Sequence, residues 1–164
     1  MAQANTLFMK ITDIKGTVTD AGYKEWIAIN HLDQGIYSSV GISNSESLLK
    51  SGNAGFDDVS FTKEMDSTSG ALLINVAEGT AIKEIIVALT AKKAGKDYEM
   101  VRWIYENCII NRLHVSAVNA GDVPIEHLSF AFSSVKVETN TMQSAGGTQK
   151  HGPNGWDLVK NCKL

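Results

Sequence analysis

The chain has 164 residues, of which 43% are hydrophobic and 20% are charged, and its formal net charge is −3. This composition predicts one soluble globular domain, whereas two prolines and fourteen glycines exclude a collagen-like or proline-rich architecture. The acidic balance argues against nucleic-acid binding, and no stretch approaches the roughly 20 apolar residues of a membrane helix, so we expect no membrane insertion. Residues 1–10 lack the pattern of a signal peptide, and we therefore expect a protein that begins in the cytoplasm.

Alternating side chains predict two strands near the start of the chain. Leu7, Met9 and Ile11 share one parity, which is typical of a half-buried strand. A second strand is expected over residues 25–32, with Ile27 and Ile29 on one face.

Residues 33–56 change in character, because serine and glycine become frequent and no period is visible. We expect a long irregular loop between the second and third strands, and loops of this length are usually functional or disordered. A flexible linker would have no need of large apolar side chains, so we expect this loop to pack against another surface. The apolar residues of the loop are Ile36, Tyr37, Val40, Ile42, Leu48 and Leu49.

A third strand is expected over residues 58–65, followed by one short helix. Ser69 is the expected N-cap of this helix, since its hydroxyl can accept a backbone N–H of the first turn. Leu72 and Val76 recur at helical spacing, and Gly79 provides the left-handed stop. A helix of about nine residues is unstable alone and must dock on a sheet.

Long strands fill the second half of the chain. Alternation predicts strands over residues 82–93 and 98–110, and a last strand in which Leu128 and Phe130 have one parity and Val135 and Val137 the other. That change of phase indicates a β-bulge or a sharp bend, as occurs where a sheet curls into a barrel. The predicted fold is therefore mainly β, a small closed or nearly closed barrel with one short flanking helix.

The tail over residues 139–164 is polar and lacks periodicity, and we assign it to the same domain as residues 1–138. Trp156 interrupts this tail and is expected to dock as an anchor, because a bulky indole in a polar tail usually packs on a neighbouring surface. Without a CxxC spacing, Cys108 is interpreted as a buried thiol and Cys162 as an exposed one.

No motif predicts catalysis, a metal site or a cofactor. The nucleophile-elbow, phosphate-loop and dinucleotide patterns are absent, and the four histidines show no ligand spacing. His31 and Asp33 share a strand face, but two ligands make a weak metal site, and we interpret them as surface residues. We therefore expect a protein that is not an enzyme, and that has no cofactor.

Several blocks, in order along most of the chain, resemble the Hcp family, the haemolysin-coregulated proteins that form the inner tube of type VI secretion systems. The blocks that carry the resemblance are Phe8-Met9-Lys10-Ile11, Ile14-Lys15-Gly16, Thr19-Asp20, Phe61-Thr62-Lys63 with Asp66, Ser69 with Leu72, Ala77-Glu78-Gly79, Ile82-Lys83-Glu84, Tyr98-Glu99, the run from Ile125 to Phe130, and Gly155-Trp156-Asp157-Leu158 with Asn161. The chain departs from the family at Gly70, where a proline is common, and at residues 32–35, where an aromatic-rich segment is common.

The resemblance implies a homohexameric ring that stacks into a tube, with a spike protein at its tip, a contractile sheath around it and small effectors in its lumen. Such a tube is assembled in the cytoplasm and expelled, which agrees with a chain that has no signal peptide. We expect the apolar loop residues to serve ring stacking or ring closure, Asp33 to lie at the lumen wall, and subunit interfaces above roughly 1,000 Å².

Two other interpretations remain open at this stage. The chain could be an effector or chaperone variant of the same system, although the region after Glu138 is too short for a further domain. It could also be a monomeric β-barrel that binds a ligand.

Overall fold

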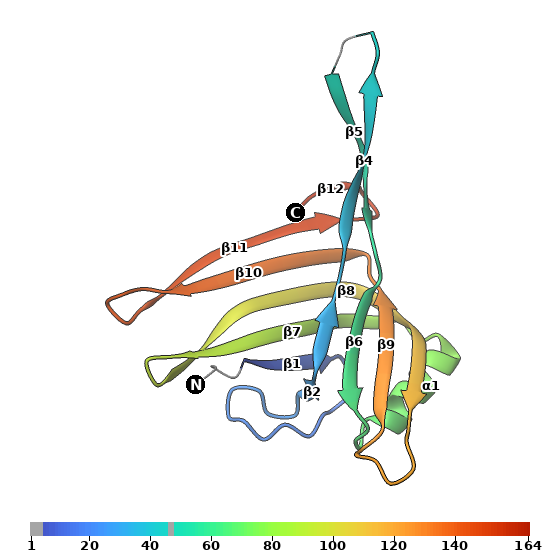
Figure 1. Cartoon of the computed structure of the whole chain (residues 1–164), viewed down its shortest axis with the longest axis vertical. Helices are drawn as coiled ribbons and strands as arrows, with labels where there is room; N and C mark the ends of the chain where they lie inside the picture. The colour runs from blue at the N-terminus through green and yellow to red at the C-terminus, as the bar shows by residue number, and fades with distance from the viewer. Residues whose placement is uncertain (1–4, 46–47) are drawn as a thin grey trace.

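The computed structural model describes residues 5–45 and 48–164. Residues 1–4, part of the segment tested for a signal peptide, and residues 46–47, within the predicted loop, lie outside the described residues. The described chain is mainly β, as predicted, with one helix, α1 (Ser69–Glu78) (Figure 1). Its strands are β1 (Thr6–Ile11), β2 (Ile27–Ile29), β3 (His31–Asp33), β4 (Ile36–Ser43), β5 (Leu48–Phe56), β6 (Val59–Glu64), β7 (Ile82–Lys93), β8 (Lys96–Ser116), β9 (Ile125–Ala131), β10 (Ser134–Met142), β11 (Thr148–Asp157) and β12 (Cys162–Lys163).

Ten of the described strands form one branched sheet, and the closed or nearly closed barrel that we expected is not confirmed. Its main path is β12-β11-β10-β8-β7-β1-β2, and β9, β6 and β3 branch from β8. The branch arises because β8 is long and bends: Asn107 has a φ of 50°, and the register with β9 shifts between Ile110 and Arg112. The first part of β8 pairs with β7 and β10, and its last part pairs with β9.

The core lies between the two limbs of this sheet. Ile27 and Ile29 of β2 pair with β1, and after one intervening residue β3 pairs with β6 instead. Tyr105 is fully buried, with its ring in edge contact with Phe130 at 5.1 Å between centroids. The predicted faces of β1 and β2 are confirmed, because Met9, Ile11, Ile27 and Ile29 are all buried.

The helix occupies the predicted residues, but its predicted start is wrong. The N-cap is Thr68, which makes no side-chain capping bond, and Ser69 is the first helical residue. The Ser69 hydroxyl accepts the backbone N–H of Asp66, which precedes the helix, at 3.0 Å, and donates to Glu126. Gly79 is the left-handed C-cap, with φ of 63°, and Leu72 is fully buried, as expected for a docked helix.

The segment predicted as an irregular loop is a β-hairpin. β4 and β5 form a separate two-stranded sheet, in which Ile42 lies opposite Leu49 and the register shifts between Ser38 and Val40. The prediction failed because the hairpin has no buried face, so its sequence lacks the alternation that a core imposes.

The end of the chain is also more regular than predicted. The predicted last strand is two strands, β9 and β10, and the phase change marks the bend between them at residues 132–133. The tail beyond residue 138 completes β10 and forms β11 and β12, which extend the sheet. No helix in the described part of the chain is long and apolar enough to cross a membrane.

Candidate assembly surfaces

The hairpin of β4 and β5 carries the most exposed apolar surface of the described chain. The six residues identified in the sequence are 60–74% exposed: Ile36, Tyr37, Val40, Ile42, Leu48 and Leu49. Adjacent strand residues point to opposite faces, so Leu48 and Leu49 place apolar side chains on both sides of the hairpin. Neither side of the hairpin is covered, and this surface is the clearest candidate for contact with another chain.

The base of the hairpin is fixed to the body, and β4 and β5 extend beyond the rest of the molecule at one end of the longest axis (Figure 1). Phe56, at the end of β5, lies edge-on to Phe132 with ring centroids 6.1 Å apart. The backbone N–H of Asp57 donates to the carbonyl of Gly35 at 2.9 Å, and the hydroxyl of Tyr105 donates to the side chain of Gln34. The orientation of the projecting strands is therefore set by partly buried contacts at their base.

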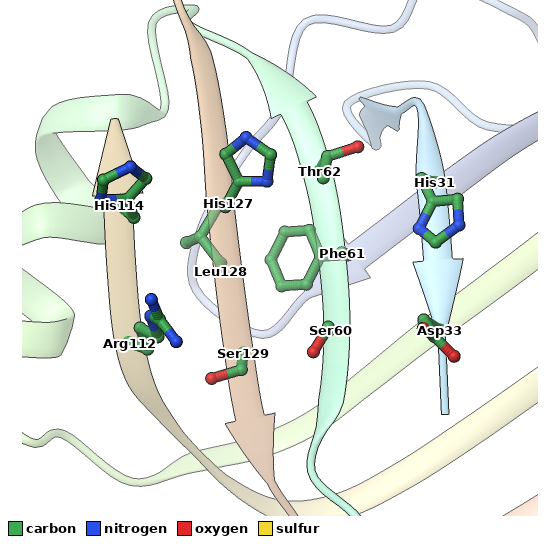
Figure 2. Close-up of a pocket in the computed structure, with 10 residues that line it drawn as sticks. All are labelled: His31, Asp33, Ser60, Phe61, Thr62, Arg112, His114, His127, Leu128 and Ser129. Atoms are coloured by element: carbon green, nitrogen blue, oxygen red, sulfur yellow. The ribbon is translucent and has the colours of Figure 1, made fainter. Parts of the chain in front are cut away.

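A second candidate surface is the polar outer face of β3, β6, β9 and the end of β8. Cross-strand registration places His31, Thr62, His127 and His114 in one row, and Asp33, Ser60, Ser129 and Arg112 in the next. Figure 2 shows these two rows on the four neighbouring strands. A hollow of about 510 Å³ lies over them.

Asp33 is exposed on this face, at the end of β3. The sequence drew attention to His31 and Asp33 but missed Arg112, His114 and His127, which come from strands distant in the sequence. Their rings and side chains meet only through strand register: His114 and His127 lie directly opposite each other, with ring centroids 6.0 Å apart. A sequence without known strand pairing offers no signal for that proximity.

Trp156, the third candidate, lies in β11 opposite Val135 of β10 and Lys163 of β12, and it is partly buried. Backbone hydrogen bonds hold the surrounding chain: Leu158 N–H donates to Ser133 at 2.8 Å, and Leu164 N–H donates to Gly155 at 3.0 Å. The end of the chain is thus part of the sheet, and the anchoring role of Trp156 itself remains a prediction.

A buried polar network connects helix α1 to β6 and β9. The ammonium of Lys63 lies 2.7 Å from Glu126 Oε2 and 3.1 Å from Asp66 Oδ1, and Ser69 donates to the same Glu126 oxygen at 3.0 Å. Burial alone would raise the pKa of Asp66, but hydrogen bonds from Thr68 and the charge of Lys63 outweigh it and hold that pKa below its ordinary value. This network fixes the start of the helix in place of a side-chain cap.

A cluster of aromatic and charged side chains lies near β1. Tyr23 stacks on Phe8 with ring centroids 4.6 Å apart, and its hydroxyl donates to Glu99 at 2.7 Å. Arg102 donates to both oxygens of Glu99, at 2.7 and 2.9 Å, and lies over the ring of Trp26. Burial would raise the pKa of Glu99, but the bonds from Arg102 and Tyr23 prevail and lower it. The cluster orders the connection between β1 and β2.

Within the described residues, no group of three or more histidine, cysteine or acidic side chains has the arrangement of a metal site. Both cysteines are free: Cys108 is buried and Cys162 is exposed, as predicted. Burial raises the pKa of the Cys108 thiol to about 12, so this thiol stays protonated.

Comparison with protein families places this architecture in a known group. The family model described as "Type VI secretion system effector, Hcp" matches residues 8–139, most of the chain. Among curated proteins, none is similar enough in sequence to count as a match.

Solved structures share the fold at low sequence identity. A structure described as that of a type six secretion system protein has 24% identity and a TM-score of 0.91, and the alignment covers 98% of this chain and 100% of the other. Hcp1 from Salmonella typhimurium has 23% identity and a TM-score of 0.77, with 98% and 99% covered. A type VI secretion system effector from Yersinia pestis has 22% identity and a TM-score of 0.68, with 92% and 98% covered.

Proposed function

Because this chain belongs to the Hcp family of type VI secretion proteins, we propose that it is the ring-forming subunit of the secretion tube, with six copies in each ring and rings stacked end to end. The observation that supports this most directly is the β4–β5 hairpin, with apolar side chains on both exposed faces. An isolated two-stranded hairpin is marginally stable in water, so a hairpin of this kind needs a partner. A structural role of this kind involves no catalytic step.

We assign the hairpin to contacts between copies. It stands at one end of the long axis, and α1 lies near the other end (Figure 1). A contact between unlike ends is heterologous, and such contacts build rings or filaments rather than isolated pairs. Ile42 and Leu49, which face each other across the hairpin, are the central residues of this proposed contact.

We assign the polar face that contains Asp33 to the lumen, where cargo would be held. This face is hollowed and lined by hydroxyl, imidazole and guanidinium groups, which bind polar surfaces rather than bury apolar ones. The proposed partners are further copies of this chain, small effectors, a spike protein and a contractile sheath. In this proposal the protein assembles in the cytoplasm and leaves the cell through the secretion system.

The test is the mass of the purified chain by light scattering, with electron microscopy of the same sample. A mass near six subunits and annular particles are expected at micromolar concentration. Ile42→Lys and Leu49→Lys in one chain should lower the mass or abolish stacking, because charge on the hairpin must be desolvated at the interface. Val159→Lys is the matched control, since Val159 is 80% exposed outside the hairpin.

A monomer at high concentration would refute the proposal and favour a solitary ligand-binding protein. A hexamer whose mass and stacking are unchanged by both hairpin substitutions would leave the ring intact and refute the role given to the hairpin. Circular dichroism checks that the double variant is folded, which is expected because Ile42 and Leu49 are exposed and lie outside the core cluster.

A further inference from the structure

Three of the four histidines of the chain lie on one polar sheet face. His31, His127 and His114 belong to a single cross-strand row that runs over β3, β6, β9 and β8, with Thr62 between the first two (Figure 2). All three imidazoles are exposed. The sequence does not reveal this proximity, because His31 precedes His114 by 83 positions and His127 by 96 positions.

The net charge of this face depends on how many of the three imidazoles are protonated and on the charged groups around them. Arg112 and Asp33 lie at opposite ends of the adjoining row, and Glu64 follows Thr62 by two residues on the same face of β6. Asp58 lies at the edge, where it accepts a hydrogen bond from Asn111 at 2.7 Å. With the three imidazoles neutral, one positive charge faces three negative charges; with all three protonated, four positive charges face the same three.

We propose that this histidine row makes the face a binding site for acidic protein segments whose affinity rises as the pH falls. Each imidazole that takes up a proton adds one positive charge to the face, and acid therefore favours the binding of negatively charged groups. Protonated imidazole and guanidinium both donate hydrogen bonds to carboxylates, and the Ser60, Thr62 and Ser129 hydroxyls add further donors between them.

An acidic protein segment suits this face better than a nucleic acid. Nucleic acids bind through many phosphate contacts and through bases stacked on aromatic rings. Here one arginine is present, and Phe61, the aromatic residue other than histidine among those that line the hollow, is buried. Successive rows on a β-sheet face, by contrast, are two residues apart along each strand, which is also the spacing of same-side carboxylates along an extended peptide that lies parallel to the strands.

The inference deepens the proposed lumen role and rests on it for biological meaning, but the binding face belongs to a single chain. In a ring, every subunit would contribute one such row, so cargo with several acidic segments would be held at several points at once. The pH of the surrounding solution would then set how firmly cargo is held.

The experiment measures binding of a labelled eight-residue aspartate peptide to the full chain by fluorescence anisotropy, at pH 5.5 and 7.5 and equal ionic strength. Binding is expected to be about tenfold tighter at pH 5.5. Replacement of His31, His114 and His127 by glutamine should remove most of this difference. His151→Gln is the matched control, because His151 lies on β11, away from this face, and should leave the difference intact.

Three results would overturn the inference: equal binding at both pH values, an unchanged pH dependence in the triple variant, or equal binding of a glutamine peptide. A single-stranded oligonucleotide that binds more tightly than the aspartate peptide would overturn the choice of an acidic protein partner. Light scattering on the same samples separates the two proposals. A hexamer without pH-dependent binding refutes only this inference, and a monomer that binds refutes only the ring.

Discussion

The buried ion pair between Lys63 and Glu126 offers the sharpest test of how this fold is held together. Both side chains are almost fully buried, at 0% and 1% exposure, and their charged atoms are 2.7 Å apart. Lys63 also contacts Asp66 and donates to the carbonyl of Glu64 at 2.8 Å, whereas Glu126 accepts a further hydrogen bond from the Ser69 hydroxyl. Removal of Lys63 and removal of Glu126 should therefore lower the free energy of unfolding by different amounts.

Lys63→Met is expected to lower the free energy of unfolding by about 3–5 kcal/mol, because it leaves the Glu126 carboxylate buried without a cation. Glu126→Gln is expected to cost less, about 1–3 kcal/mol, because Lys63 keeps Asp66 and a backbone carbonyl. In the double variant the unpaired carboxylate is gone, so its cost should be smaller than the sum of the two single costs by at least about 1 kcal/mol.

The assay is unfolding in guanidinium, followed by tryptophan fluorescence at one fixed protein concentration, since subunit association also shifts apparent stability. Lys83→Met is the matched control: Lys83 is exposed on β7, and its loss should change the free energy by no more than about 0.5 kcal/mol. The reasoning fails if Lys63→Met stays within about 1 kcal/mol of the parent chain, or if the single costs add without coupling.

Three further predictions concern the helix glycines, the acid stability of the fold and the reactivity of the two cysteines. Gly79→Ala should cost about 1 kcal/mol, because φ is 63° there, whereas Gly70→Ala in the helix should be neutral or stabilising; equal effects in chemical unfolding would contradict this. The melting temperature should fall as the pH drops below about 4.5, because Glu99 has a lower pKa in the folded chain and the unfolded chain therefore binds more protons; a flat profile to about pH 3 would be inconsistent. With a thiol reagent at about pH 8, Cys162 should react in the folded protein and Cys108 only after unfolding; two reactive thiols in the native state would disagree.

The parts of the fold that could be predicted are those in which a core imposes a period. The shared face of Met9 and Ile11 and the helix stop at Gly79 could be predicted from spacing alone, and both predictions are confirmed. The N-cap could not, because Ser69 has the right residue type, but its hydroxyl is engaged outside the helix with Asp66 and Glu126. A single sequence shows which residues are able to cap, and tertiary contacts decide which of them do.

The branched sheet and the histidine row depend on a different kind of information. Whether β8 bends at Asn107 and leaves β7 for β9 is decided by pairing between strands that are distant in sequence. His127 and His114 face each other because of that pairing, and a shift of one residue would turn one of them to the other side. Composition and local alternation do not determine such a register, so the histidine row could not be predicted from the sequence.

The lack of a buried face on the β4–β5 hairpin explains why the sequence did not predict its strands, and it also bears on the function of the hairpin. In a strand with one buried face, polar and apolar residues alternate, because every second side chain faces water and the others face the core. β4 and β5 have no buried face within the chain, and Leu48 and Leu49 stand side by side with both exposed. A sequence that keeps apolar residues on both faces of an exposed hairpin gains nothing from them inside its own fold. The missing alternation therefore agrees with the proposed contact between the hairpin and another copy.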